Sequence, residues 1–295
     1  MTRPRILDVL KTGRVLVSDG AWGTFLQQKG LTVGDSPESW NLTHFDDVKS
    51  IAASYIAAGA DLVETNSFGG NRCKLEYFGL ADRAAGINEA AARASREAAG
   101  EDRWVMGSIG PTGKMLVLEE VTEEDLYDAF KEQAVALEKG GADAICIETM
   151  TDRDEAVQAV RAAKENTSCE VLCTFTFDRT KQGTYRTMMG VSPVEAALAA
   201  IYAGADVVGA NCGHGLEDML GIVKEIRAAI PDVPILVQAN AGLPLVVDGR
   251  TVFPESPEFM ASLVGPLLAA GCNLVGGCCG TTPAHIAAIA RAVRG

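Results

Sequence analysis

Three cysteines next to glycines are the side chains of this sequence best suited to chemistry. Cys278 and Cys279 are adjacent within Gly276-Gly-Cys-Cys-Gly280, and Cys212 also precedes a glycine. A mutual disulfide between adjacent cysteines is strained, whereas their two thiolates can bind one metal ion. Three thiolates with room for a fourth ligand are typical of a catalytic zinc site, so the sequence predicts Zn²⁺ on Cys212, Cys278 and Cys279. The alternative is that these cysteines are small buried hydrophobic residues.

The other five cysteines are not expected to bind metal. Cys73 is alone in an expected loop, and the rest lie in or beside apolar segments, namely Cys146, Cys169, Cys173 and Cys272. The first 20 residues do not have the pattern of a secretory signal, because charged residues interrupt their apolar runs. We therefore expect a cytoplasmic protein with reduced thiols.

A zinc ion held by three thiolates would suit a sulfur substrate. The net charge of such a centre is −1, which makes it a poor activator of water but a suitable partner for an electron-rich fourth sulfur. A free thiol with a pKa of about 8.5 is only about 3% ionised at pH 7. Lowering its pKa enough for full ionisation requires a free energy of roughly 2 kcal/mol, which binding to zinc can supply. The predicted fourth ligand is therefore a substrate thiol.

Two carboxylates narrow the choice of substrate. Asp19 and Glu148 end two predicted strands, and burying both without compensation is costly, so a cationic group is expected between them. The alternatives are that Asp19 caps the following helix and that Glu148 pairs with an arginine. Thr65 and the backbone amides near Gly20 are candidates for binding a carboxylate. A thiol, an ammonium and a carboxylate together describe a thiol amino acid.

The elements that must position these residues alternate along the whole chain. Short β-rich runs predict eight strands, and longer alanine-rich amphipathic segments between them predict helices. The strands are expected at 15–19, 61–65, 104–109, 144–149, 171–177, 207–211, 235–240 and 273–277, and helices at 46–58, 123–139, 152–164, 193–203, 216–229 and 257–270. Thr122, Thr151 and Ser192 are expected to cap three of the helices.

A short repeated motif supports a count of eight strand–helix units. Ala-Gly-Ala-Asp or a close variant ends at Asp61, Asp143, Asp206 and Asn273, where a glycine stops a helix before a strand. Eight units of about 37 residues predict a (β/α)₈ TIM barrel, with residues 1–295 forming a single domain. The alternative, a doubly wound open sheet, would need a G-x-G-x-x-G fingerprint that the segment from Asp19 to Thr24 lacks.

Several motifs resemble the homocysteine S-methyltransferase family over nearly the whole chain. The likeness is greatest to the homocysteine-binding module of cobalamin-dependent methionine synthase, with betaine-homocysteine and S-methylmethionine-homocysteine methyltransferases as more distant relatives. The matching motifs are Asp19-Gly-Ala-Trp-Gly-Thr, Glu64-Thr-Asn-Ser-Phe, Gly107-Ser-Ile-Gly-Pro-Thr-Gly, Gly209-Ala-Asn-Cys-Gly, Gln238-Ala-Asn-Ala-Gly-Leu-Pro and Gly276-Gly-Cys-Cys-Gly-Thr-Thr-Pro. One departure is Ala239, where the family commonly has proline.

The resemblance implies methylation of homocysteine to methionine on a (β/α)₈ barrel that is a homocysteine-binding methyltransferase domain. It implies zinc on the three cysteines already named. It also implies that the homocysteine amino group binds Asp19 and Glu148, and that the homocysteine carboxylate lies near Thr65 and the Gly20 loop. Beyond the zinc-bound substrate thiolate, no separate catalytic residue is expected.

The methyl donor is left open by the sequence. An Asp-x-His-x-x-Gly corrinoid motif does not occur around any of the three histidines. Methylcobalamin is therefore expected on a separate corrinoid protein, and small donors such as betaine, S-methylmethionine or another sulfonium are the alternative. Two further alternatives are a non-catalytic zinc- or thiol-binding barrel subunit and an enzyme that methylates a different thiol.

Composition excludes some other classes of function. The chain has 26 basic and 39 acidic side chains, a net charge of −13, which disfavours nucleic-acid binding. Its longest uncharged apolar helical stretch is about half of the roughly 20 residues that a membrane span needs. His214 is either a fourth metal ligand or solvent-facing, and His44 and His285 are expected at the surface. Met188 and Met189 either line a donor entrance or simply pack.

Overall fold

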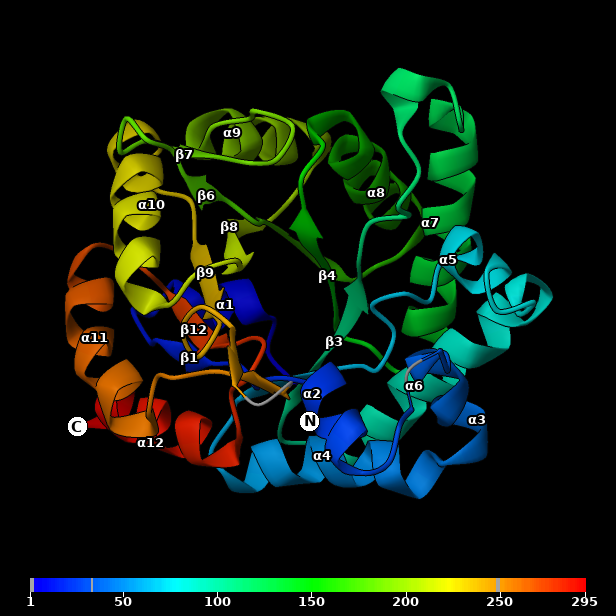
Figure 1. Ribbon diagram of the computed structural model, residues 1–295, viewed down its shortest axis with the longest axis horizontal. Coiled ribbons are helices and arrows are strands. Elements are labelled where there is room, and N and C mark those ends of the chain that lie inside the picture. The colour runs from blue at the N-terminus through cyan, green and yellow to red at the C-terminus, as the bar shows by residue number, and fades with distance from the viewer. Residues whose placement is uncertain (1–2, 33, 248–249) are drawn as a thin grey trace.

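Eight short apolar segments form parallel strands around a common axis, as seen in the computed structural model, which describes residues 3–32, 34–247 and 250–295 (Figure 1). All eight lie where the sequence predicts strands, although the first is only two residues long. They are β1 (Leu16–Val17), β2 (Leu62–Glu64), β3 (Trp104–Ile109), β4 (Ala144–Met150), β5 (Glu170–Phe175), β8 (Val207–Cys212), β9 (Ile235–Ala239) and β12 (Leu274–Gly277).

Helices form a ring outside the strands, as expected for a (β/α)₈ barrel (Figure 1). The ring consists of α4 (Phe45–Ala57), α6 (Ala84–Ala99), α7 (Glu123–Lys139), α8 (Arg153–Asn166), α9 (Pro193–Ala203), α10 (Leu216–Ala229), α11 (Pro257–Ala269) and α12 (Pro283–Arg294). All six helices predicted from the sequence are present. Shorter helices and hairpins complete the chain: α1 (Ile6–Leu10), α2 (Gly23–Gln28), α3 (Trp40–Thr43), α5 (Arg72–Glu76), β6–β7 (Asp178–Arg179 with Tyr185–Arg186) and β10–β11 (Leu245–Val247 with Arg250–Val252).

Two of the three predicted helix caps are confirmed. Thr122 and Ser192 accept hydrogen bonds from backbone amides in the first turns of α7 and α9, each in a capping box. The prediction of Thr151 as a cap is wrong. Its neighbour Asp152 caps α8, with Oδ1 accepting from the Asp154 amide at 2.7 Å, because a carboxylate satisfies the free amides at a helix start at least as well as a hydroxyl.

The Ala-Gly-Ala-Asp repeat has a structural role beyond stopping a helix. The backbone amide of each terminal Asp or Asn donates to a carbonyl of the neighbouring strand, and its side chain accepts from a backbone amide of that same strand. The side-chain bonds are Asp61 with Val17, Asp143 with Val105, Asp206 with Val171 and Asn273 with Ile235, at 2.8–3.0 Å. Each repeat therefore fixes the start of one strand against the previous one.

Strands β1 and β2 meet where the ladder of hydrogen bonds is interrupted. The ladder runs β1-β12-β9-β8-β5-β4-β3-β2, so these two strands are its ends. Side chains bridge the gap: Asp61 bonds to Val17 near the strand starts, and Asp19 Oδ2 accepts from the Glu64 amide at 2.9 Å near the strand ends. Two aspartates thus help to close the barrel.

Helix α1 fills the end of the barrel where the strands begin. Ile6 and Leu10 belong to one buried apolar cluster that includes residues from all eight strands. The Glu170 carboxylate, at the start of β5, accepts from the amides of Ile6 and Leu7 at 2.7 and 2.8 Å. This end is therefore filled, and an open site can form only where the strands end.

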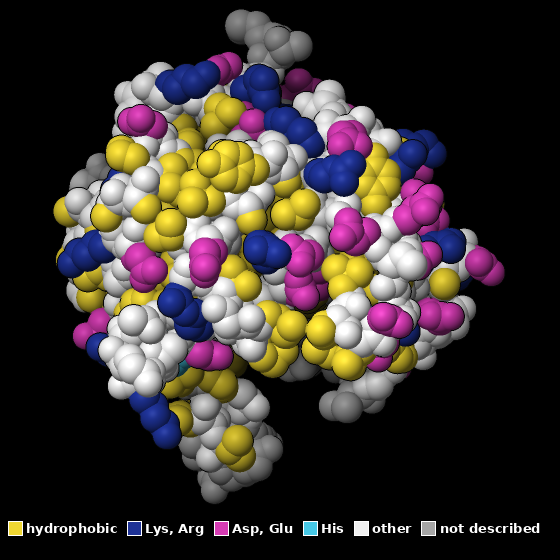
Figure 2. All heavy atoms as spheres, turned by 90° about the horizontal axis from the view of Figure 1, so that it is seen from above, with side chains coloured by type: hydrophobic (Ala, Val, Ile, Leu, Met, Phe, Trp, Pro, Cys, Tyr) yellow, Lys and Arg dark blue, Asp and Glu magenta, His cyan; other side chains and the backbone are white. Residues whose placement is uncertain are grey.

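The outer surface carries charges of both signs. On the face seen in Figure 2, acidic and basic side chains are interspersed among apolar ones. Ion pairs between neighbouring helices of the ring include Lys49–Glu97 and Lys139–Glu89. Across the described residues, the helices are all too short or too polar to span a lipid bilayer.

Replacing Asp206 tests the role of the repeat. We expect Asp206→Ala to lower the free energy of unfolding by about 1–3 kcal/mol, because the Val171 amide loses its side-chain acceptor. Asp206→Asn should stay within about 1 kcal/mol of the parent, since Asn273 makes the same bond with an amide oxygen. Urea denaturation measures both. Equal losses in the two variants would contradict the proposed acceptor role.

Candidate active site

The three predicted cysteine ligands come together at the mouth of the barrel. Cys212 ends β8, and Cys278 and Cys279 follow β12, with β9 lying between these two strands. Their sulfur atoms lie within 4.8 Å of one another. Sulfurs bound to one tetrahedral zinc would be about 3.8 Å apart, from a Zn–S distance of about 2.3 Å. The spacing therefore permits a shared metal ion.

The electrostatics of the three thiols also fit a cation. Hydrogen bonds from the Cys278 and Cys279 thiols lower the pKa of Cys212 to about 3, and the same interaction with Cys212 raises the pKa of Cys279 to about 12 and that of Cys278 well above its usual value. One sulfur is thus stabilised as a thiolate at the expense of the other two. All three can ionise together only if a positive charge lies among them.

Glycines and Thr281 set the position of the cysteine pair. A Cβ on Gly276 would lie 1.9 Å from the Ser18 hydroxyl oxygen, so only glycine allows β12 to pack this closely against β1. Thr281 Oγ1 donates to the Cys278 carbonyl at 2.7 Å and accepts from the Ala21 amide at 3.1 Å. The Gly-Gly-Cys-Cys-Gly-Thr motif is thereby tied to the loop after β1.

The remaining cysteines behave largely as expected. All eight, which fall within the described ranges, are free thiols, and Cys146, Cys169, Cys173 and Cys272 are buried. Cys73 is partly exposed, but it lies in helix α5 rather than in the predicted loop.

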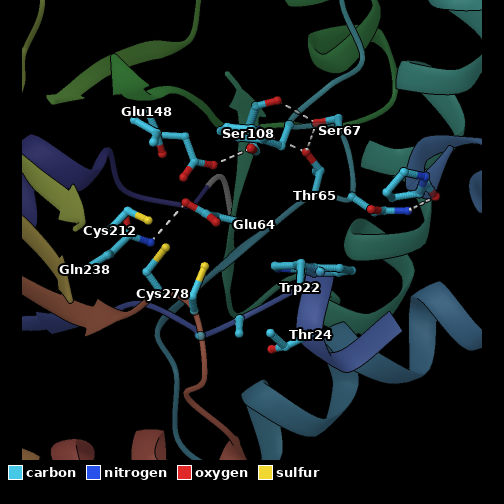
Figure 3. Close-up of a pocket in the computed structure, with 18 of the residues that line it drawn as sticks. Trp22, Thr24, Glu64, Thr65, Ser67, Ser108, Glu148, Cys212, Gln238 and Cys278 are labelled. Atoms are coloured by element: carbon cyan, nitrogen blue, oxygen red, sulfur yellow. Dashed lines mark hydrogen bonds between the residues drawn. The ribbon is translucent and has the colours of Figure 1, made fainter. Parts of the chain in front are cut away.

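A cavity of about 320 Å³ opens beside the sulfurs (Figure 3). Glu64, Glu148, Thr65 and Gln238 line its polar side, and Trp22, Pro37 and Phe68 contribute apolar walls. Within the part of the chain that the structure describes, the lining includes no Lys, Arg or His. The cavity is therefore acidic and able to accept a cationic group.

Glu148 is buried and firmly oriented in this cavity. Ser108 Oγ donates to Glu148 Oε1, and Asn211 Nδ2 donates to Glu148 Oε2 at 3.1 Å. Burial and the nearby Glu64 charge raise the pKa of Glu148 well above its usual value. The alternative that Glu148 pairs with an arginine is wrong, since Arg is not among its partners in the described residues.

Asp19 lies behind the cavity wall and is fully buried. Its Oδ2 accepts from the Glu64 amide and the Trp22 indole, both at 2.9 Å, while Oδ1 has no hydrogen-bond partner. Burial, followed by the Glu64 charge, raises its pKa well above the usual value. The alternative that Asp19 caps the next helix is wrong, because α2 has no side-chain cap.

Thr65 and Gly20 line the cavity as the sequence suggests. The Thr65 hydroxyl accepts from the Ser108 amide at 3.0 Å and bonds to Ser67 Oγ at 2.6 Å, and Ser67 Oγ donates to the Ser108 carbonyl at 2.7 Å. This chain of hydroxyls joins β2 to β3, and Ser108 carries it on to Glu148.

Sequence reasoning missed Glu64 and Gln238 as members of the site. Glu64 ends β2 and Gln238 belongs to β9, and Gln238 Nε2 donates to Glu64 Oε1 at 3.0 Å across the barrel mouth. Burial raises the pKa of Glu64 to about 7. The sequence did contain a signal for both residues: each begins one of the motifs named above and lies near the end of a predicted strand.

The histidines do not join the sulfurs. His214 Nε2 lies 3.3 Å from Asp178 Oδ1, and His214 Nδ1 lies 3.1 Å from Asp218 Oδ2, so both ring nitrogens face carboxylates. His44 is exposed as expected. The prediction of a surface position for His285 is wrong: it is buried, because its ring completes the cap of α12 and contacts the Glu255 carbonyl at 3.0 Å.

Met188 and Met189 are exposed rather than packed, with Met188 77% accessible. They follow β7, in the long connection after β5. The packing alternative is therefore wrong for Met188, and a role at a donor entrance stays a prediction.

Comparison with known proteins agrees with these features. A family model described as homocysteine S-methyltransferase matches residues 16–293. The chain is 36% identical over 302 residues to a methionine synthase of Mycobacterium tuberculosis and 35% identical to one of Mycobacterium leprae, matches that cover 98% and 97% of this chain. It spans only 25% of the length of each of these two proteins.

Solved structures show the same fold. The metallated form of the homocysteine methyltransferase MmuM from Escherichia coli matches with a TM-score of 0.80 at 21% identity, covering 96% of this chain and 98% of that chain. Its apo form matches with a TM-score of 0.74 at 20% identity, with the same coverage.

Asn211 lies between two unusual backbone positions in this site and bonds directly to one of them, Thr149. Thr149 and Cys212 both have left-handed φ angles, of 59° and 58°, and such residues persist only where their surroundings fix them. Asn211 accepts from the Thr149 amide and donates to its hydroxyl, both at 2.7 Å. Asn211→Ala should therefore lower the free energy of unfolding by about 2–4 kcal/mol.

Urea denaturation checks this expectation, with Asn166→Ala as the control. Asn166 in α8 bonds to the Tyr127 hydroxyl and the Ala162 carbonyl near the surface. Asn166→Ala should therefore lower the free energy of unfolding by less than about 1 kcal/mol. Equal losses would show that Asn211 has no special structural role.

Proposed function

Because this chain belongs to the homocysteine S-methyltransferase family, we propose that it transfers a methyl group to the thiol of homocysteine and forms methionine. One observation carries the proposal: three sulfurs within 4.8 Å of one another adjoin a cavity lined by buried carboxylates. The sulfurs suit a metal that binds a thiol, and the carboxylates suit an ammonium group. Residues 1–295 would act as one homocysteine-binding barrel domain.

The resident metal in this proposal is zinc, held by Cys212, Cys278 and Cys279. Three sulfur donors favour Zn²⁺ over hard cations, and a four-coordinate zinc with three protein ligands would have one position for a substrate sulfur. When bound, zinc would supply the positive charge that keeps the substrate thiol ionised at neutral pH. The relative described as a metallated form is consistent with a metal in this fold.

The chain's own residues would orient the amino acid. Glu148, fixed by Ser108 and Asn211, would accept from the substrate ammonium, and Asp19 would add its negative charge from behind the cavity wall. Thr65 and the Gly20 loop would border the substrate carboxylate. The apolar walls would exclude water and align the sulfur with the methyl–donor bond, so that the new C–S bond forms as that bond breaks.

The proposed donor is a methyl-corrinoid carried by a separate protein or by another part of a longer protein. The similarity to methionine synthases, of which this chain spans a quarter, favours such a donor. A small donor such as betaine or S-methylmethionine is the alternative. With either donor, the exposed side chains of Met188 and Met189 would border the entrance to the site.

A donor panel tests the proposed function. Zinc-loaded protein is incubated with homocysteine and, separately, a methyl-corrinoid protein, betaine, S-methylmethionine or S-adenosylmethionine, and methionine is measured by mass spectrometry. We expect methionine with the methyl-corrinoid protein. Methionine with a small donor alone would replace the proposed donor, and no methionine with any donor would favour a non-catalytic zinc-binding subunit.

Replacing one cysteine tests the proposed metal site. Cys279→Ser should reduce bound zinc from about one ion per chain to a small fraction and abolish methyl transfer, because one of three protein ligands is lost. Zinc is measured by mass spectrometry after gel filtration, and circular dichroism checks that the barrel is folded. Cys73→Ser, a cysteine outside the sulfur cluster, should keep its zinc. Full zinc content in Cys279→Ser would contradict the ligand assignment.

A further inference from the structure

Glu64 and Gln238 form a second acidic contact point in the cavity, which the family likeness does not assign. Glu64 is 6% exposed and Gln238 is 2% exposed, and both line the cavity. Figure 3 shows the Glu64 and Glu148 carboxylates entering the same space from β2 and β4, beside the sulfurs of Cys212 and Cys278. The Gln238 amide nitrogen holds Glu64 in this position with a 3.0 Å hydrogen bond.

The hydrogen bonding around Glu64 lacks a donor. Gln238 Oε1 is buried without a partner, although its Nε2 is bonded to Glu64. Buried acceptors in folded proteins normally have donors, so the unpaired oxygen of Gln238, a side chain that lines the cavity, indicates a donor that arrives with a ligand.

The charge around Glu64 indicates what kind of donor is missing. Burial raises the pKa of Glu64 to about 7, which shows that its charge is poorly compensated. No cationic side chain lies among the described residues that line the cavity. A primary ammonium group supplies a positive charge and three N–H donors at one atom, which satisfies several acceptors together.

We propose that Glu64, held by Gln238, is a further contact for the substrate ammonium and sets the preference of the site for an amino-acid thiol over a thiol acid without an amine. The inference rests on the proposed function, since it concerns the same homocysteine site. Glu64 on β2 and Glu148 on β4 would both accept hydrogen bonds from the ammonium. Asp19 would act through Glu64, because its Oδ2 accepts from the Glu64 amide.

The test compares two ligands that differ only in the amino group. Binding of L-homocysteine and of 4-mercaptobutyrate to zinc-loaded protein is measured by titration calorimetry. For Glu64→Gln we expect the dissociation constant of homocysteine to rise about 10- to 100-fold, the usual loss for a hydrogen bond between charged groups. The dissociation constant of 4-mercaptobutyrate should change less than about threefold, because that ligand has no ammonium.

Two other variants complete the experiment. Glu155→Gln also neutralises a buried carboxylate, one that bonds to Thr112 and does not line the cavity, so it should bind both ligands as the parent does. Gln238→Ala removes the hydrogen bond that holds Glu64, and we expect it to weaken homocysteine binding about 3- to 10-fold without affecting 4-mercaptobutyrate. This variant tests the inference independently if Glu64→Gln folds poorly.

The outcomes separate this inference from the proposed function. Parent protein that does not bind homocysteine would overturn both. Parent protein that prefers homocysteine, together with a Glu64→Gln variant that keeps the full preference, would overturn the role of Glu64 alone. Equal weakening of both ligands in Glu64→Gln would also overturn it, because a purely structural defect acts on both.

Discussion

The close approach of three sulfur atoms at the mouth of the barrel constrains the rest of the site, because three thiolates this near repel one another unless a cation lies among them. Without that cation, Cys212 is stabilised as a thiolate mainly by the thiols of Cys278 and Cys279, with smaller contributions from the Gly213 amide and the Asn240 side chain. The surrounding structure keeps them together nevertheless. Glycines let β12 approach β1, Thr281 ties the cysteine pair to the first loop, and the left-handed turn at Cys212 directs its sulfur to the others.

The carboxylates in and behind the cavity wall also lack a compensating positive charge. Asp19, Glu64 and Glu148 are all buried, and burial is the first cause of the raised pKa of each. Burying these carboxylates together costs stability, and a cationic ligand in the cavity would offset that cost. The two halves are linked through Asn211, which holds the Glu148 carboxylate and directly precedes Cys212. The Glu148 carboxylate and the Cys212 sulfur are therefore positioned by the same short segment of β8.

Much of the fold was predictable because its signals are local. Each strand is a short apolar run, each helix has a periodic apolar face, and the glycines before Asp61, Asp143, Asp206 and Asn273 stop helices through positive φ angles. The errors arose where local signals compete. Thr151 and Asp152 are both good caps, and only the backbone path selects Asp152. His285 looked like a surface residue because its burial depends on Glu255, which is distant in sequence.

The sequence by itself determined the kinds of chemistry available: a cysteine pair between glycines, a third cysteine before a glycine, and carboxylates at strand ends. Only the tertiary structure decided which of these groups share the cavity. Closure of the barrel brings β2 opposite β9, so Gln238 meets Glu64. At the junction of β1 and β2, where the ladder of strand pairs is interrupted, Asp19 lies against the Glu64 amide instead of in the cavity wall. These partners are set by strand order and register, which arise from hydrogen bonds and packing between distant segments and leave no mark on the local sequence.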